Sequence, residues 1–135
     1  MTDHEFLAAF ENCSLPEKQW THRAHVRMAW LNLRRSPLVQ AIDTVRTGIQ
    51  RFNTSLNKPL GYHETITIAF LYLISHRMQR AESDESFDDF CGRNTDLVDQ
   101  STNILLAHYR KETLFSPLAR QTFVEPDLLP LPRGS

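Results

Sequence analysis

Three histidines of the chain have a spacing that suits a transition-metal site. His22 and His25 are three residues apart and therefore share one face of a helix. His63 begins the apolar stripe of another predicted helix, and Glu64 follows it directly. Neutral imidazoles and a carboxylate are typical ligands of Zn²⁺, Fe²⁺, Mn²⁺ or Ni²⁺, and three or four protein ligands leave room for water or substrate. These four residues are the candidate metal ligands.

The site depends on how the helices are arranged. Short connections predict that the helices near 22–34, 37–52 and 63–74 run antiparallel, so that the first and the third begin at the same end. If those two helices are neighbours, the three histidines converge there and Glu64 turns toward them. Glu64 then serves as a fourth ligand or as the general base for metal-bound water. The sequence thus predicts a metal-dependent enzyme, a hydrolase or an oxygenase, that acts on a small polar molecule.

The same residues also fit two other functions. Both histidine groups lie at helix N-termini, whose partial positive charge disfavours a cation and favours an anion. They therefore also suit a non-catalytic binding or regulatory module that holds an anionic metabolite without metal. A structural helical subunit is the third interpretation, and it predicts an apolar surface patch and histidines bonded to backbone carbonyls. The sequence leaves all three open.

Three further residues are candidates for binding the small molecule. Tyr62 precedes His63 and offers a hydroxyl group. Trp20 lies just before the histidine pair, where it either walls the pocket or packs as a hydrophobic staple. Arg120 suits a substrate carboxylate, although a salt bridge to a nearby acid is the more common role of such an arginine.

The elements that position these residues are expected to be helices. The chain has only four glycines and no Asn-Gly or Asp-Gly hairpin signal, and its prolines lie between stretches of helical periodicity. The expected fold is all-α, a single-domain antiparallel bundle of five to six helices over residues 1–132 with an extended tail. Residues 133–135 are either a tag remnant or native. The expected helices cover 3–12, from Ser14 or Thr21 to 34, 37–52, 63–74, 87–91, 97–114 and a turn after Ser116-Pro117.

The composition and net charge argue against nucleic acid and membranes as the main binding partners. The chain has 135 residues, of which 41% are hydrophobic and 23% charged, as in an ordinary globular domain. A net charge of −1 gives no electrostatic reason to expect nucleic acid or an anionic membrane as partner. No apolar run approaches the roughly 20 residues of a membrane span, and the first residues do not resemble a signal peptide. We therefore expect a cytoplasmic protein that binds a small molecule, with a homodimer through a spare apolar face left open.

Two short stretches carry a family resemblance. Trp20-Thr-His-Arg-Ala-His25 and Tyr62-His-Glu-Thr65 resemble the W-T-H-x-A-H and Y-H-E-T motifs of a family of small bacterial all-helical proteins. The stretch from Arg46 to Asn53 and the tail Pro126-Asp-Leu-Leu-Pro130 fit the same pattern, so the resemblance covers most of the chain. It implies that the histidine motifs characterise the family, and it implies no reaction.

A weaker likeness, at the level of the fold, is to metal-binding four-helix bundles of the DinB type, which hold a divalent metal with three histidines. Those proteins place their paired-histidine motif late in the chain. In this sequence the pair comes early.

Overall fold

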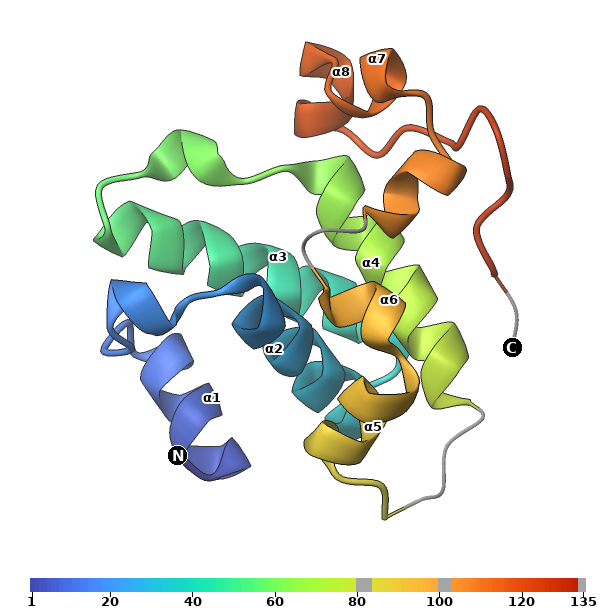
Figure 1. Cartoon of the computed structure of the whole chain (residues 1–135). Coiled ribbons are helices and arrows are strands. Elements are labelled where there is room, and N and C mark those ends of the chain that lie inside the picture. Colours follow the sequence, from blue (N-terminus) through green and yellow to red (C-terminus); the bar gives the residue numbers. More distant parts are fainter. Residues whose placement is uncertain (80–83, 100–102, 134–135) are drawn as a thin grey trace. The chain divides into compact units, whose positions relative to one another are not determined.

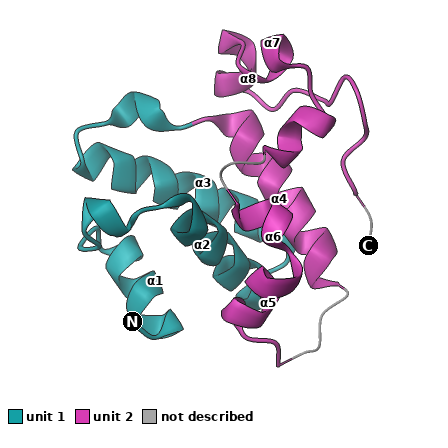
Figure 2. Ribbon diagram, viewed as in Figure 1, with its two compact units in different colours: residues 1–62 teal, residues 63–135 magenta. Residues whose placement is uncertain are grey.

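The computed structural model describes residues 1–79, 84–99 and 103–133, and over these residues the chain forms helices joined by turns and loops (Figure 1). The all-α prediction is thus confirmed for the described residues. No helix among them is long and apolar enough to cross a membrane. The chain divides into two compact units, unit 1 with residues 1–62 and unit 2 with residues 63–135 (Figure 2). The prediction of one domain is therefore not confirmed.

Unit 1 contains three helices whose starts follow from local side-chain caps. The threonine before the first helix accepts a hydrogen bond from the Glu5 amide, and Glu5 bonds back to the Thr2 amide, which completes a capping box. Thr21 caps the second helix, because its Oγ1 accepts from the Ala24 amide at 3.2 Å. The predicted alternative cap at Ser14 is wrong. The elements are α1 (Asp3–Glu11), η1 (Glu17–Gln19), α2 (His22–Arg35), α3 (Leu38–Ser55) and η2 (Pro59–Gly61).

The core of unit 1 is built on aromatic rings and one close helix contact. Phe10 of α1 and Phe52 of α3 are buried, with ring centroids 5.5 Å apart. Val45 and Ile49 share the buried face of α3 with Phe52, as the periodicity predicts. Gly48 lies on this face because a side chain does not fit there: a Cβ atom would come within 2.8 Å of the Phe10 ring.

Unit 2 contains one long helix and several short ones. Its elements are α4 (Glu64–Met78), α5 (Phe87–Arg93), α6 (Thr95–Val98), η3 (Ile104–Ala107), α7 (Lys111–Leu114) and α8 (Pro117–Gln121). Ser116 caps α8 and a proline begins it, as predicted. The helix α4 extends beyond the predicted end at 74, and its Arg77 forms a salt bridge with Asp96 at 2.8 Å. Asp96 lies in the first turn of α6, so this salt bridge connects α4 to α6.

The predicted long helix over 97–114 is wrong. The described residues of this stretch form three short elements, and residues 100–102 lie outside the described part. The chain leaves the helical path after η3 because its backbone bonds to the C-terminal tail: the Leu128 amide donates to the His108 carbonyl at 2.9 Å. Asp127 accepts from the Arg110 amide at 2.9 Å and from Thr113 Oγ1 at 2.6 Å. Contacts from the tail thus override local helical periodicity.

The contact at Gly48 gives a stability test. In Gly48→Ala the new methyl group meets the Phe10 ring, which is 2% exposed and packed by other rings, so that it has no room to move. Overpacking costs about 1–3 kcal/mol, which we expect to exceed the roughly 1 kcal/mol that alanine gains in a helix. Thermal unfolding should show a lower melting temperature for this variant.

Gly92→Ala is the matched control. Gly92 lies on α5, and nothing comes within 4 Å of a Cβ atom built there. We expect this variant to be as stable as the parent or more stable, by up to about 1 kcal/mol. Equal melting temperatures for the two alanine variants would contradict the close approach of Phe10 to α3.

Candidate functional site

His63 uses both of its ring nitrogens in unit 2. It is the N-cap residue of α4, where Nδ1 accepts from the Ile66 amide at 3.1 Å. Nε2 lies 2.8 Å from the carbonyl oxygen of Leu114, which can only accept, so Nε2 carries the proton. Burial lowers the pKa of His63, partly offset by the Leu114 hydrogen bond, and the charge of Arg120 lowers the pKa further. Binding a metal through His63 would break one of these two bonds.

Thr65, two residues later in the same motif, holds the segment after α8. Its side chain is fully buried. Oγ1 donates to the Thr122 carbonyl at 2.8 Å and accepts from the Val124 amide at 3.1 Å. Thr67 instead donates to the His63 carbonyl one turn earlier on the same helix, as threonines inside helices commonly do. In unit 2 the Y-H-E-T motif therefore supplies hydrogen bonds to the C-terminal part of the chain.

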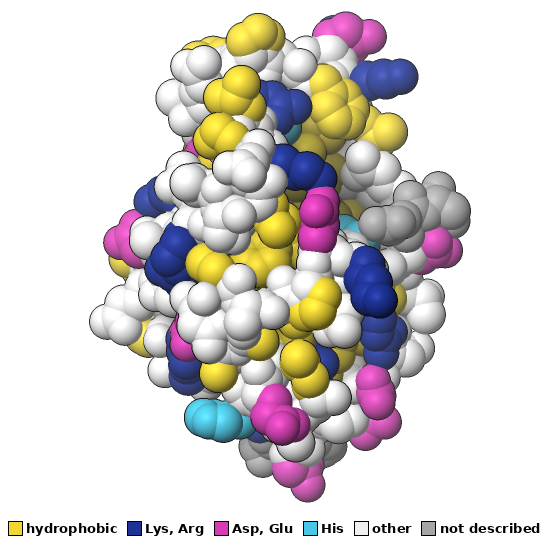
Figure 3. Space-filling model, turned by 90° about the vertical axis from the view of Figure 1, so that its left-hand side faces the viewer, with side chains coloured by type: hydrophobic (Ala, Val, Ile, Leu, Met, Phe, Trp, Pro, Cys, Tyr) yellow, Lys and Arg dark blue, Asp and Glu magenta, His cyan; other side chains and the backbone are white. Residues whose placement is uncertain are grey.

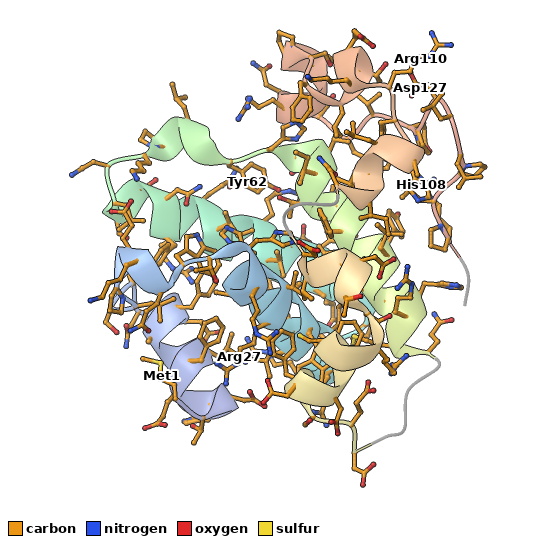
Figure 4. The ribbon with its side chains drawn as sticks, in the orientation of Figure 1. Met1, Arg27, Tyr62, His108, Arg110 and Asp127 are labelled. Carbon is orange, nitrogen blue, oxygen red and sulfur yellow. The ribbon has the colours of Figure 1, made fainter. Side chains whose placement is uncertain are left out.

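The tail has further polar contacts with the middle of unit 2 (Figure 4). Tyr109 is buried, and its hydroxyl donates to the Val124 carbonyl at 2.6 Å. His108 Nδ1 lies 2.8 Å from the Leu129 carbonyl. Arg133, set aside as part of a possible tag remnant, pairs with Glu125 at 2.6 Å. The other two residues of that stretch lie outside the described part.

His25 of unit 1 has one engaged and one open ring nitrogen. Nδ1 lies 2.7 Å from the Thr21 carbonyl, so Nδ1 carries the proton. Burial lowers the pKa of His25 to about 4, the Thr21 bond acts in the opposite direction, and the charge of His22 lowers the pKa further. The ring is therefore neutral at pH 7, and its Nε2 is a hydrogen-bond acceptor. Within the described part of the chain, Nε2 has no hydrogen-bond partner.

Trp20 packs directly on this imidazole. The centroids of the Trp20 and His25 rings are 3.8 Å apart with an interplanar angle of 29°. Phe10 also stacks on the indole at 4.8 Å, and Phe52 packs at a tilt at 5.1 Å. Among the described residues, the indole Nε1 of Trp20 is the one buried side-chain nitrogen or oxygen without a hydrogen-bond partner. An unpaired donor thus lies beside an imidazole with an unpaired acceptor.

The remaining predicted site residues lie in both units. His22 is the first residue of α2, and Tyr62 ends unit 1. Glu64 is the first residue of α4, and Arg120 is exposed on α8. His22 and His25 therefore belong to one unit and His63 and Glu64 to the other, and their convergence stays a prediction. The described residues include no group of three or more His, Cys, Asp or Glu placed to hold a metal ion.

Two surface features were not predicted as sites. A shallow groove along α1 and α3 of unit 1 is lined by charged and hydroxyl side chains: Glu11, Asp43, Thr44, Thr47 and Arg51. In unit 2, Phe115 and Leu118 next to and on α8 are 50% and 64% exposed, and hydrophobic surface is visible at the top of Figure 3, where α7 and α8 lie. An apolar patch of this kind is one feature that a structural subunit would have.

Comparisons with known proteins add no functional assignment. No protein-family model matches the chain, and no curated protein or solved structure matches it either. The resemblance carried by the histidine motifs therefore stays an expectation.

The two threonines of α4 provide a test of unit 2. Thr65→Val keeps the side-chain shape but removes two hydrogen bonds to residues 122–124, and we expect a loss of about 2 kcal/mol in the free energy of unfolding. Thr67→Val removes one bond within its own helix and should cost less than about 1 kcal/mol. Urea denaturation measures both, and equal losses would contradict the role given to Thr65.

The depressed pKa of His25 predicts a dependence of stability on pH. The His25 imidazole is protonated near pH 6.5 in the unfolded state and only near pH 4 in the folded state. Its contribution to the free energy of unfolding is therefore complete above pH 6.5 and is lost as the pH falls from 6.5 toward 4. The difference between parent and His25→Phe should change over this window by on the order of 2–3 kcal/mol. His4→Phe, at an exposed histidine of α1, is the control for the loss of a histidine, and a change of the same size in this variant would contradict the prediction.

Proposed function

We propose that the chain is a non-catalytic small-molecule-binding module whose site lies at Trp20 and His25 of unit 1. The observation that carries this proposal is the buried, unpaired indole N–H of Trp20. An unpaired buried donor costs about 1–3 kcal/mol, and folded proteins pair nearly all such groups with protein or water. A ligand atom that accepts this hydrogen bond recovers that free energy on binding, which gives the site a source of affinity.

His25 supports the same location. Its imidazole stacks on Trp20, and its Nε2 is held as an acceptor by the bond from Nδ1 to Thr21. Donor and acceptor therefore belong to adjacent rings. The indole packs against Phe10 and Phe52, and the imidazole is held by its stacking on the indole and its bond to Thr21. Fixed polar groups in an apolar surrounding are typical of small-molecule sites, where they orient the ligand.

The metal-dependent enzyme has less support from the geometry. His63 would have to give up a hydrogen bond to α7 or its cap of α4. His25 is the predicted ligand that fits best, because metal-bound histidines commonly donate their other ring N–H to a carbonyl. A metal site would therefore contain His25 and show little dependence on His63.

The experiment is a thermal-shift screen of the full chain with small polar compounds and, separately, with Zn²⁺, Fe²⁺, Mn²⁺ and Ni²⁺. A compound bound at the proposed site stabilises the parent but not Trp20→Phe or His25→Phe, which keep the aromatic packing and lack the ring nitrogens. His63→Asn is the control that should retain binding, since asparagine still caps a helix. Stabilisation by a metal alone, lost in His63→Asn, would contradict the proposal and favour the enzyme.

Trp20→Phe also has a distinctive expected stability. It removes the unpaired donor together with part of the ring, so that the loss in free energy of unfolding should stay below about 1 kcal/mol or become a gain. Trp30→Phe is the control in α2, where the ring is 2% exposed and lies under Arg34, and it should cost more, about 1–3 kcal/mol. Chemical denaturation compares the two, and a larger loss for Trp20→Phe would show that its N–H is paired in solution.

A further inference from the structure

The side chain of Arg133 lies against two aromatic rings and a carboxylate of unit 2. The central carbon of its guanidinium group is 5.0 Å from the centroid of the Tyr72 ring and 5.3 Å from that of the Phe123 ring. One guanidinium nitrogen pairs with the Glu125 carboxylate at 2.6 Å. The two ring centroids are 6.1 Å apart and the rings are inclined at 55°. Tyr72, Phe123 and Glu125 therefore surround one cation, and we call them the cation cage.

The chemistry of the cation cage suits a guanidinium group. Aromatic faces attract cations through the ring quadrupole, and clusters of rings recognise organic cations in this way. A carboxylate beside the rings accepts a charge-assisted hydrogen bond from the guanidinium N–H groups. Because Arg133 already places its charged group over both rings and against the carboxylate, the space between them is accessible to a guanidinium and large enough to hold it.

Phe123 is held in the cage by backbone bonds on both sides. Thr65 Oγ1 of α4 donates to the Thr122 carbonyl at 2.8 Å and accepts from the Val124 amide at 3.1 Å. The Tyr109 hydroxyl donates to the Val124 carbonyl at 2.6 Å. None of these bonds involves the arginine, so the segment that carries the aromatic ring keeps its position without it.

Tyr72 is placed by α4, and the arginine is held more weakly than the cage. Tyr72 follows Thr65 by seven residues and therefore lies on the same face of this helix. Arg133 is two residues beyond Leu131, which is buried, and its own side chain is 39% exposed. Exposed ion pairs and cation–π contacts are weak. Arg133 can therefore leave the cage while Leu131 stays buried.

We propose that the cation cage is a binding site for a small guanidinium compound and that Arg133 occupies it as an internal competitor. The incoming guanidinium contacts the rings of Tyr72 and Phe123 and donates to the carboxylate of Glu125 in place of the arginine. The site belongs to unit 2 and does not depend on the function proposed for unit 1.

The test compares the parent with Arg133→Ala, in which the cage is open. Methylguanidinium, N-methylurea and tetramethylammonium are titrated at pH 6.5 and constant ionic strength, and ¹H–¹⁵N spectra of the full chain follow the amides of Phe123 and Glu125. N-methylurea resembles methylguanidinium in shape but has no charge, and tetramethylammonium has the charge but no N–H group. Arg110→Ala is the matched control, because it removes another exposed arginine of unit 2 that is not in the cage.

We expect methylguanidinium to shift both amides of Arg133→Ala with saturation in the millimolar range usual for so small a ligand. It should bind the parent and Arg110→Ala at least about threefold more weakly, because the internal arginine occupies the cage in both. N-methylurea should cause no saturable shift. Tetramethylammonium should bind Arg133→Ala at least about threefold more weakly than methylguanidinium does, because it cannot donate to Glu125.

A second readout needs no variant and holds if Arg133→Ala fails to fold. In the parent, methylguanidinium should move the Nε–H cross-peak of Arg133 toward the position of a free arginine side chain, and N-methylurea should leave it in place. This displacement follows because both guanidinium groups compete for the same rings and the same carboxylate.

Three results would overturn the proposal. If methylguanidinium causes no saturable shift in a folded Arg133→Ala and does not move the Arg133 cross-peak of the parent, the contacts of this arginine are only structural. If Arg110→Ala gains as much affinity as Arg133→Ala, the effect is one of net charge and not of the cage. If N-methylurea or tetramethylammonium binds as tightly as methylguanidinium, the ligand class is wrong.

Discussion

The need to pair backbone polar groups at the ends of many short helices constrains this structure more than any other single factor. Each helix end leaves amides or carbonyls without a partner in the helix, and a chain of short helices has many such ends. Here side chains supply the partners. His63 caps α4 and bonds the Leu114 carbonyl of α7. Thr65 bonds the backbone after α8 at Thr122 and Val124, and Asp127 of the tail accepts from the amide of the residue before α7. Against this extensive pairing, the unpaired indole of Trp20 is an exception that needs a cause.

His25 and His63 have similar positions in the sequence but different chemical roles, because their ring nitrogens bond different backbone groups. Both lie at the start of a helix within a motif that suggests ligation. His63 accepts from an amide with Nδ1 and donates with Nε2, so its bonding capacity is used within unit 2. His25 donates from Nδ1 to a carbonyl one turn back, and its Nε2 is left open. The tautomer, which is set by neighbouring backbone atoms, decides which of the two rings can bind something else.

The sequence predicted features that depend on local chemistry. Caps, breakers and periodicity predicted the positions of α1, α2 and α5 to within two residues, and the proline at the start of α8. The helix predicted over 97–114 was wrong because Leu128 and Asp127, distant in sequence, bond the backbone at 108 and 110. Single-domain organisation was not confirmed, since hydrophobic periodicity carries no signal for a division between residues 62 and 63.

The sequence identified the residues of the candidate site but not their stacking or their hydrogen bonds. Trp20 and His25 were both identified from the sequence, one as a pocket wall or staple and the other as a metal ligand. Their stacking and the unpaired indole nitrogen depend on how Phe10 and Phe52 pack around them, which no spacing rule contains. In the same way, the use of His63 as a double hydrogen-bonding partner requires the carbonyl of Leu114, fifty-one residues later.

Long-range ¹H–¹⁵N correlation spectra of the full chain at pH 7, with and without Zn²⁺, report which ring nitrogen of His25 and of His63 carries the proton. We expect a neutral His25 with its proton on Nδ1 and a neutral His63 with its proton on Nε2, the latter unchanged by Zn²⁺. A His25 with its proton on Nε2, or a Zn²⁺-induced loss of the proton from Nε2 of His63, would contradict the hydrogen-bonding roles assigned to these two rings.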